Sequence, residues 1–284
     1  MNHLVDTLIN IAIQEDVGTG DLTSDAIFPV DSEGLAYAVA KEDLVFSGQF
    51  MINKILLKFD GRTVYIPYKR SGTLCKKGEK LFEVRGCIRK ILTVERTLLN
   101  FIQHFSGIAT LTRQFVDIAE PYGVKVCDTR KTLPGYRVLE KKAVRDGGGH
   151  NHRMGLFDGV MIKDNHIDFC GSITAAVKLV RKKVPHTVRV EVETRNLDEV
   201  REAIDARADI IMLDNMEHAM IEDAIRIVDK RALVEVSGGI NLENIESYCK
   251  LQPDIISTGY ITHSARAMDI SLRVNKSGDS NAIA

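Results

Sequence analysis

Six short β-branched runs, each followed by a helical stretch, restrict the fold of this chain more than any other feature. Their first residues are Val124, Gly159, Val188, Ile210, Leu233 and Ile255. These starts lie 35, 29, 22, 23 and 22 residues apart, close to the combined length of one strand, one helix and two short loops. Strands at that spacing are parallel and joined by helical crossovers. We therefore expect a parallel α/β fold from Val124 onward.

Polar or charged groups follow at the carboxyl end of every run. They are Arg130 and Lys131, Lys163, Glu193, Asp214, Ser237 and Gly238, and Thr258 and Gly259. In a closed β/α barrel all of these ends meet at one mouth, whereas a doubly wound sheet collects ligands only at its switch point. Six such positions favour a barrel. Because a full barrel has eight strands, the sequence predicts either an incomplete barrel or two strands too irregular to recognise.

The first half of the chain has a different pattern. We expect a helix at 4–14, strands at 35–40, 63–67 and 81–85, and turns at Gly61, Gly72 and Gly78. These elements predict a separate α+β domain. Apolar positions between residues 88 and 105 recur every third or fourth residue, which predicts a helix that links the two domains and breaks at Ser106 and Gly107.

These patterns together predict an α/β protein of two domains. We expect an N-terminal α+β sandwich domain over 1–110, with part of the C-terminal segment as a candidate addition to it. An incomplete (β/α) barrel of about six parallel strands follows over 111–273. Residues 274–284 show no periodicity, so we expect a mobile tail there.

Charge and composition exclude several classes of function. Lys and Arg number 38 and Asp and Glu number 39, so no global basic field attracts nucleic acid or an anionic membrane. No stretch reaches the roughly 18 apolar residues of a transmembrane helix. Asp6, Glu15 and Asp16 interrupt the pattern of a secretory signal, and the five cysteines show no C-x-x-C spacing. We expect a cytoplasmic protein with no nucleic-acid or membrane partner.

The segment from Arg130 to Lys163 is strongly basic. It holds eight Lys and Arg residues and three acids, a net charge of +5 in 34 residues, so the rest of the chain carries −6. Guanidinium groups pair with carboxylate or phosphate in bidentate fashion, and lysine adds a point charge. We expect Arg130, Lys131 and Lys163 to bind a multiply charged anion because they follow strand ends, whereas the cations within 141–145 fit a solvated helix face.

Two acids lie in this otherwise basic mouth. Glu193 and Asp214 end successive strands. Carboxylate oxygens suit Mg²⁺, which binds through one or two carboxylates together with waters and substrate phosphate oxygens. The alternative is that both acids pair with neighbouring lysines. Glu191 shares the strand face of Glu193, and whether it points into the barrel interior stays open.

Other signals in the mouth are weaker. Gly238 and Gly259 follow strand ends, where backbone N–H groups can approach phosphate oxygens. His152 and His166 fit either a structural role or contact with a ligand. The glycine run at 147–149 lacks the lysine and hydroxyl of a P-loop, so neither ATP hydrolysis nor dinucleotide binding has a supporting motif.

Seven runs of the sequence resemble a known family, quinolinate phosphoribosyltransferase. They are EDVGTGDLTS (15–24), ERTLLNFIQHFSGIAT (95–110), DTRKTLPGYRVLEKKAVRDGGGHNHRMGLFDGVMIKDNHI (128–167), VEVET (190–194), ADIIMLDN (208–215), EVSGGI (235–240) and ISTGYITHS (256–264). The resemblance covers nearly the whole chain. One departure is Lys142, where the family often has an aromatic residue.

The resemblance implies an N-terminal α/β sandwich, an incomplete α/β barrel, and a homodimer or higher oligomer whose active sites are shared between subunits. It implies that quinolinate, phosphoribosyl pyrophosphate and Mg²⁺ are used to form nicotinate mononucleotide, pyrophosphate and CO₂ in NAD synthesis. Motif by motif, it assigns quinolinate to Arg130, Lys131, His152, Arg153, Lys163 and His166, with Arg96 from the neighbouring subunit. It assigns the ribose and magnesium to Glu193 and Asp214, the phosphate to Ser237, Gly238 and Gly259, and catalysis to Lys163, Glu193 and Asp214.

Three other functions are compatible with these residues. Lys163 at a strand end could form a Schiff base with a carbonyl substrate, as in class I aldolases. A phosphoribosyltransferase could instead use a related anion, such as nicotinate without decarboxylation or a substrate of the molybdenum-associated relatives. A barrel without turnover could merely bind phosphorylated metabolites, although the presence of both Glu193 and Asp214 argues against it.

Overall fold

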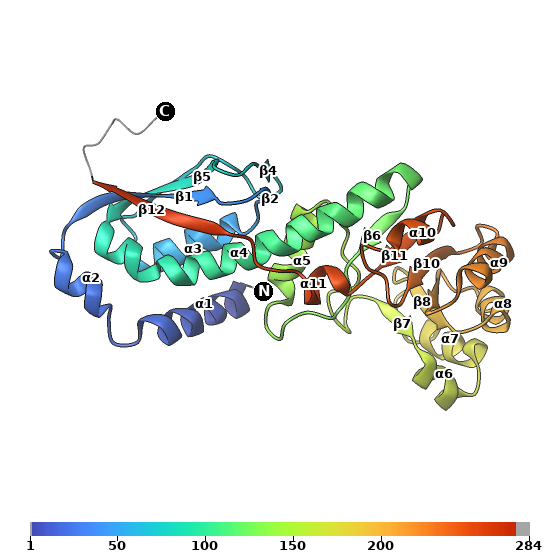
Figure 1. Ribbon diagram of the computed structural model, residues 1–284. Coiled ribbons are helices and arrows are strands. Elements are labelled where there is room, and N and C mark those ends of the chain that lie inside the picture. The colour runs from blue at the N-terminus through green and yellow to red at the C-terminus, as the bar shows by residue number, and fades with distance from the viewer. Residues whose placement is uncertain (1, 277–284) are drawn as a thin grey trace. The chain divides into compact units, whose positions relative to one another are not determined.

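The computed structural model describes residues 2–276, which form two compact units (Figure 1). The amino-terminal unit comprises the chain up to Leu111, Pro134–Gly148 and the segment from Ala265 onward. The barrel unit comprises Thr112–Leu133 and Gly149–Ser264.

The amino-terminal unit is built on a four-stranded antiparallel sheet of order β12-β1-β5-β3. These strands are β1 (Glu33–Ala40), β3 (Val64–Pro67), β5 (Lys80–Cys87) and β12 (Ile270–Lys276), with β2 (Leu44–Val45) and β4 (Leu74–Cys75) as a separate pair. The helices are α1 (Asn2–Val17), α2 (Leu22–Ile27), α3 (Gln49–Phe59), α5 (Arg137–Asp146) and the first part of α4 (Ile88–Ala119). Burial alternates along β1, so that Ala36 and Ala38 face the core. The ring centroids of Phe46 and Phe82 lie 6.4 Å apart in this core.

Helix α4 continues through the position where the sequence predicts a break. Ser106 is buried and exchanges hydrogen bonds with the backbone of Ser47, so it joins α4 to the loop before α3. A Cβ on Gly107 would lie 1.9 Å from the carbonyl oxygen of Arg266. Gly107 is therefore required for the close approach of the segment that leads into β12, and the predicted break is wrong.

Part of the carboxyl-terminal segment belongs to the amino-terminal sheet. Strand β12 pairs along its length with β1, from Gly34 with Lys276 to Ala40 with Ile270. The backbone N–H of Met268 also donates to the carbonyl of Gln103 in α4. The segment from Ala265 onward thus groups with the amino-terminal unit. Of the tail expected at 274–284, residues 277–284 lie outside the described residues.

The barrel unit contains a parallel sheet of six strands in the order β6-β11-β10-β9-β8-β7, which confirms the predicted fold class. Its strands are β6 (Lys125–Cys127), β7 (Val160–Ile162), β8 (Val190–Thr194), β9 (Ile210–Asp214), β10 (Leu233–Ser237) and β11 (Ile255–Ser257). Strands β6 and β7 are consecutive in the chain but form opposite edges, so the barrel is open between them. A parallel bridge from Cys127 to His150 continues the backbone pairing beyond β6.

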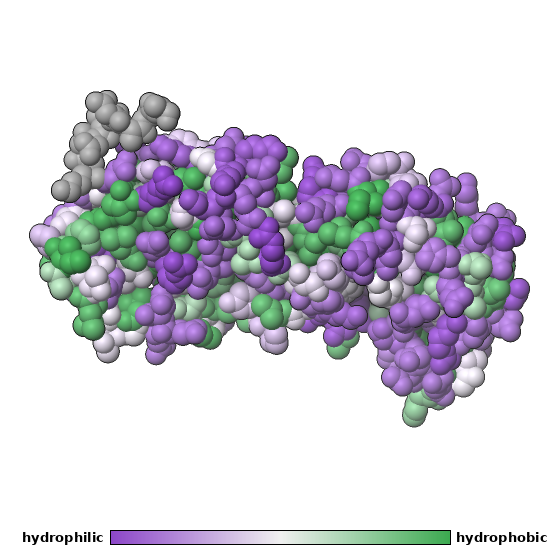
Figure 2. Space-filling model, viewed as in Figure 1, coloured by the Kyte–Doolittle hydropathy of each residue, from purple (hydrophilic) through white to green (hydrophobic). Residues whose placement is uncertain are grey.

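Helices accompany the strands in the alternation that the spacing predicts. They are α6 (Asp164–Cys170), α7 (Ile173–Arg181), α8 (Leu197–Asp205), α9 (His218–Val228), α10 (Ile245–Cys249) and α11 (Tyr260–His263), with a 3₁₀ turn at Glu120–Tyr122. Ser172 and Asn196 accept backbone N–H groups at the starts of α7 and α8 and so fix where these helices begin. The face of this unit in Figure 2 is mostly hydrophilic, with scattered apolar side chains.

Among the described residues, no helix combines the length and apolar character that a membrane span requires.

On α5, Lys142 and Arg145 are exposed as expected, but Lys141 is fully buried. The expectation of a solvated face is therefore wrong for Lys141, because burial extends around α5 through the consecutive residues Leu139, Glu140 and Lys141.

Candidate functional site

A pocket of about 610 Å³ opens at the carboxyl ends of the barrel strands. Each of the six strands contributes a lining residue at or just beyond its end. The sequence-predicted residues among them are Arg130, Lys131, His152, Arg153, Lys163, Glu193, Asp214, Ser237, Gly238 and Gly259. The chain therefore brings together at one mouth the positions that strand spacing places at separate strand ends.

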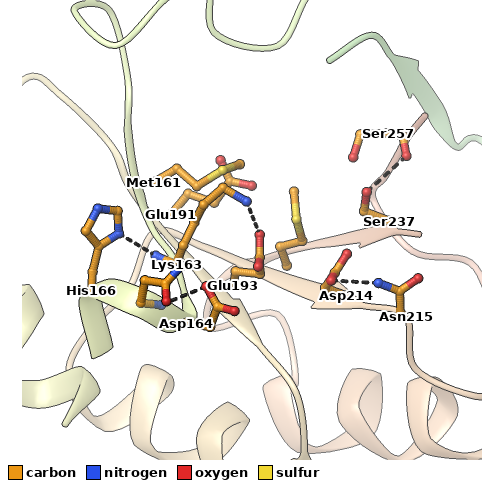
Figure 3. Close-up of polar contacts among 12 residues, drawn as sticks. Met161, Lys163, Asp164, His166, Glu191, Glu193, Asp214, Asn215, Ser237 and Ser257 are labelled. Atoms are coloured by element: carbon orange, nitrogen blue, oxygen red, sulfur yellow. Dashed lines mark hydrogen bonds and ion pairs between the residues drawn. The ribbon is translucent and has the colours of Figure 1, made fainter. Parts of the chain in front are cut away.

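Two predicted residues are not in this lining. His166 lies in the first turn of α6, where its Nδ1 accepts the backbone N–H of Lys163 at 2.9 Å (Figure 3). It serves as part of the helix cap in this structure. Arg96 lies on α4 in the amino-terminal unit and not in the barrel unit that holds the pocket.

Two guanidinium groups form the cationic part of the pocket. Burial, followed by repulsion from Arg130, lowers the pKa of Arg153 below the usual guanidinium value. Arg153 Nη1 donates to the carbonyl of Gly159 at 3.2 Å, which fixes its side chain along the start of β7. Arg130 Nε is buried and has no hydrogen-bond partner among the described residues. A buried charged donor of this kind is suited to accept an anionic ligand as its partner.

Lys163 and Glu193 meet across the ends of neighbouring strands β7 and β8. Lys163 Nζ donates to Glu193 Oε2 at 2.5 Å (Figure 3). The Lys163 side chain is 43% exposed and that of Glu193 only 13%. The alternative that the acids pair with neighbouring lysines thus holds for Glu193.

Asp214 has a different partner. Asn215 Nδ2 donates to Asp214 Oδ2 at 2.8 Å, and Asn215 has a backbone φ of +53°. A Cβ on Gly238 would lie 2.2 Å from Asn215 Oδ1, so only glycine allows the two loops to approach this closely. The sequence interpretation missed Asn215, which follows its strand directly and could have been found by extending the strand-end rule by one residue.

The glycine-containing turns after β10 and β11 form the opposite part of the pocket. Gly238 and Gly239 have φ of +106° and +62°, which turns the backbone sharply after Ser237. A Cβ on Gly259 would lie 2.6 Å from Lys131 Cδ, so this glycine makes room for the lysine stem. Thr262 Oγ1 donates to the carbonyl of Lys131 at 2.7 Å and holds that loop.

Two buried acids lie beneath the pocket. Glu191 on β8 and Glu235 on β10 are 3% and 1% exposed. Glu191 Oε2 is 2.9 Å from His152 Nε2, and Glu235 Oε1 is 3.6 Å from the same nitrogen. Burial, and then the nearby Glu191 carboxylate, raise the pKa of Glu235 to about 7. The sequence interpretation missed Glu235, although it lies two residues before Ser237 and so on the same strand face.

A mouth that joins cations, two carboxylates and glycine-containing turns on an open α/β barrel defines an enzyme site for anionic and phosphorylated substrates. Two family models match the chain: Quinolinate phosphoribosyl transferase, N-terminal domain, over residues 21–106, and the C-terminal domain of the same enzyme over residues 108–273. The chain therefore belongs to the quinolinate phosphoribosyltransferase family, as the sequence resemblance predicts.

Individual relatives agree along the full chain. It is 44% identical to the probable nicotinate-nucleotide pyrophosphorylase [carboxylating] of Bacillus subtilis, over 99% of this chain and 97% of the relative. It is 42% identical to the chloroplastic nicotinate-nucleotide pyrophosphorylase [carboxylating] of Arabidopsis thaliana, over 94% of this chain and 82% of the relative.

Solved structures give the same result for the fold. NadC from Streptococcus pyogenes superimposes with a TM-score of 0.93 at 38% identity, covering 97% of this chain and 98% of that one. The nicotinate-nucleotide pyrophosphorylase from Francisella tularensis has a TM-score of 0.93 at 40% identity, covering 97% of each chain.

Proposed function

We propose that the pocket of the barrel unit is the active site of this chain, a quinolinate phosphoribosyltransferase of the decarboxylating type that makes nicotinate mononucleotide for NAD biosynthesis. One observation supports this assignment above others. A single pocket holds the partnerless Arg130 Nε, the carboxylates of Glu193 and Asp214, and the glycine-containing turns. A pyridine dicarboxylate and a sugar pyrophosphate require these three kinds of group.

Quinolinate is assigned to the cationic part of the pocket. Arg130 and Arg153 face its two carboxylates, because guanidinium forks match carboxylate geometry. Lys163 and Lys131 add point charges, and His152 lines the same part. The positive charges of Arg130 and Arg153 repel each other, so a bound dianion offsets an unfavourable interaction.

Phosphoribosyl pyrophosphate is assigned to the part of the pocket formed by the glycine-containing turns and the two acids. The backbone at Ser237, Gly238 and Gly259 receives phosphate oxygens. Glu193 and Asp214 lie on neighbouring strands and supply hard oxygen ligands, which fit Mg²⁺ held through water or through substrate phosphate. When bound, Mg²⁺ neutralises charge on the departing pyrophosphate oxygens.

The chain's own residues mainly position and screen the reactants. The ribose anomeric carbon gains oxocarbenium character as pyrophosphate leaves, and Glu193 and Asp214 stabilise that positive charge. The pyridine nitrogen attacks this carbon. The resulting ring cation then stabilises the carbanion left by loss of the adjacent carboxylate as CO₂, and this carbon takes up a proton from water to give the product. Lys163 acts as an ammonium partner of Glu193, to which its Nζ donates, and not as a nucleophile.

We further propose a homodimer or higher oligomer in the cytoplasm, in which Arg96 of the neighbouring subunit completes the quinolinate site. His166 stays a candidate for substrate contact in that complete site. Every residue that the family resemblance assigns to the site then has a place in the proposal. Arg96 is the one that the barrel unit alone does not supply.

Incubation with quinolinate, phosphoribosyl pyrophosphate and Mg²⁺, with detection of nicotinate mononucleotide and CO₂ in equal amounts, tests the proposal. Nicotinate in place of quinolinate should give no product. A borohydride-trapped adduct on Lys163, or quinolinate binding without any release of pyrophosphate, would contradict it.

A further inference from the structure

The mechanism above leaves the buried pair Glu191 and Glu235 without a role. We infer that Glu191 is a positioning residue for the quinolinate end of the pocket, acting through His152 on Arg153. This inference rests on the proposed assignment of quinolinate to that end. It concerns a residue beneath the pocket, because Glu191 is 3% exposed and is not in the pocket lining.

The hydrogen bonds of the His152 ring define its tautomer. The backbone N–H of Arg153 donates to His152 Nδ1 at 2.8 Å, so Nδ1 carries a lone pair. The proton of the neutral ring is then on Nε2, which faces Glu191 Oε2 at 2.9 Å. Glu191 accepts the hydrogen bond from this N–H and thereby fixes both the tautomer and the plane of the ring.

The backbone on either side of the ring has a second anchor. Asp128 Oδ1 accepts the backbone N–H of His152 at 2.9 Å, and Asp128 Oδ2 accepts Asn151 Nδ2 at 2.6 Å. The 151–153 segment is therefore held by Asp128, through the His152 backbone and the Asn151 side chain, and by Glu191 through the His152 ring. Arg153 leaves this turn directly into the pocket, so its position depends on both anchors.

A divalent cation is the other way to satisfy these groups, because the ligand atoms of His152, Glu191 and Glu235 all lie within 4.8 Å of one another. The tautomer argues against it. A protonated Nε2 has no lone pair for a metal, and Nδ1 is already engaged with Arg153. The neighbouring guanidinium of Arg153 adds repulsion to any cation placed there.

The test uses two substitutions at Glu191. Glu191→Leu removes the acceptor at similar volume, and Glu191→Gln keeps an oxygen that can accept from Nε2. We expect Glu191→Leu to weaken quinolinate binding at least ~10-fold by calorimetry, the loss expected for a hydrogen bond to a charged group. The KM for phosphoribosyl pyrophosphate should change by less than about 2-fold, and Glu191→Gln should stay within about 3-fold of the parent in both. Glu222→Gln, an exposed acid on α9, controls for the lost charge.

A second measurement serves if Glu191→Leu does not fold. Nitrogen-15 spectra of the histidine rings, with His152 assigned through His152→Gln, should show protonated Nε2 and unprotonated Nδ1 in the parent and in Glu191→Gln. Protonated Nδ1 would overturn the inference. Equal losses in Glu191→Leu and Glu191→Gln, unchanged quinolinate affinity in Glu191→Leu, or zinc binding that depends on Glu191 would do the same.

The two proposals fail in distinguishable ways. If the parent enzyme binds quinolinate and forms nicotinate mononucleotide while Glu191→Leu binds quinolinate normally, only the positioning role is lost. If the parent forms no nicotinate mononucleotide, the proposed function fails whatever the Glu191 variants do.

Discussion

Lys163 Nζ lies 2.5 Å from Glu193 Oε2, so a group assigned to quinolinate forms an ion pair with a group assigned to the ribose. Each substrate must therefore separate or share this ion pair. Because the two residues end adjacent strands, the pair couples the two halves of the site directly.

Glu193→Gln should change turnover and quinolinate binding in different ways. We expect kcat to fall at least ~100-fold, the scale measured for loss of one electrostatic group at a developing charge. Quinolinate binding alone should stay the same or become tighter, because Lys163 is released from its ion pair. Calorimetry with quinolinate and steady-state turnover measure the two quantities. Weaker quinolinate binding with normal kcat would contradict this assignment.

Gly238→Ala should disturb Asp214 through Asn215. The new Cβ would lie 2.2 Å from Asn215 Oδ1, and the amide that donates to Asp214 would be displaced. We expect kcat to fall ~10-fold or more and the Mg²⁺ requirement to rise. Gly239→Ala is the matched control, since its φ is also positive but no atom lies within 4 Å of its Cβ. Equal effects in both variants would mean that backbone strain, and not the clash, is responsible.

Glu235 should make stability depend on pH. Its pKa is raised to about 7 from 4.5, so the folded protein binds this proton more tightly than the unfolded chain does. The stabilisation that this proton gives the folded protein is complete below pH 4.5 and is lost as pH rises to about 7. Glu235→Gln should remove this pH dependence of the free energy of unfolding, which amounts to about 3 kcal/mol between pH 4.5 and about 7. Urea unfolding of both proteins at several pH values measures it, and parallel curves would refute the assignment.

Gly107→Ala should destabilise the amino-terminal unit although alanine favours helices. The added Cβ would lie 1.9 Å from the carbonyl oxygen of Arg266, and overpacking of this kind costs about 1–3 kcal/mol. Gly61→Ala, with open space at its Cβ, should change the free energy of unfolding by less than about 0.5 kcal/mol. Thermal unfolding of the two variants compares them, and equal midpoints would exclude the proposed close approach.

The alternation of strands and helices in the barrel could be predicted because it depends on local periodicity. Val190–Thr194 and Ile210–Asp214 form strands at the expected places, with Glu193 and Asp214 at their ends. The sheet order could not be predicted, since β6 and β7 follow each other in the chain but lie at opposite edges. That order depends on packing between distant segments.

The residues of the candidate site also divide into those that local sequence could predict and those that depend on distant segments. Residues at or directly after strand ends, such as Asp214 and Lys163, could be placed at the pocket from the sequence because strand ends converge in this fold. His166 was ambiguous, because the spacing that brings it near Lys163 also suits a helix cap. Glu235 was missed because an acid within an apolar strand has no local signal of burial, and its neighbours come from other strands.

The pairing of β12 with β1 has a consequence for synthesis on the ribosome. Strand β1 is made among the first forty residues, but its neighbour ends at Lys276. Throughout translation of the barrel, one edge of β1 therefore lacks its hydrogen-bonding neighbour and is open to incorrect pairing. The nascent amino-terminal sheet can be completed only when nearly the whole polypeptide has left the exit tunnel.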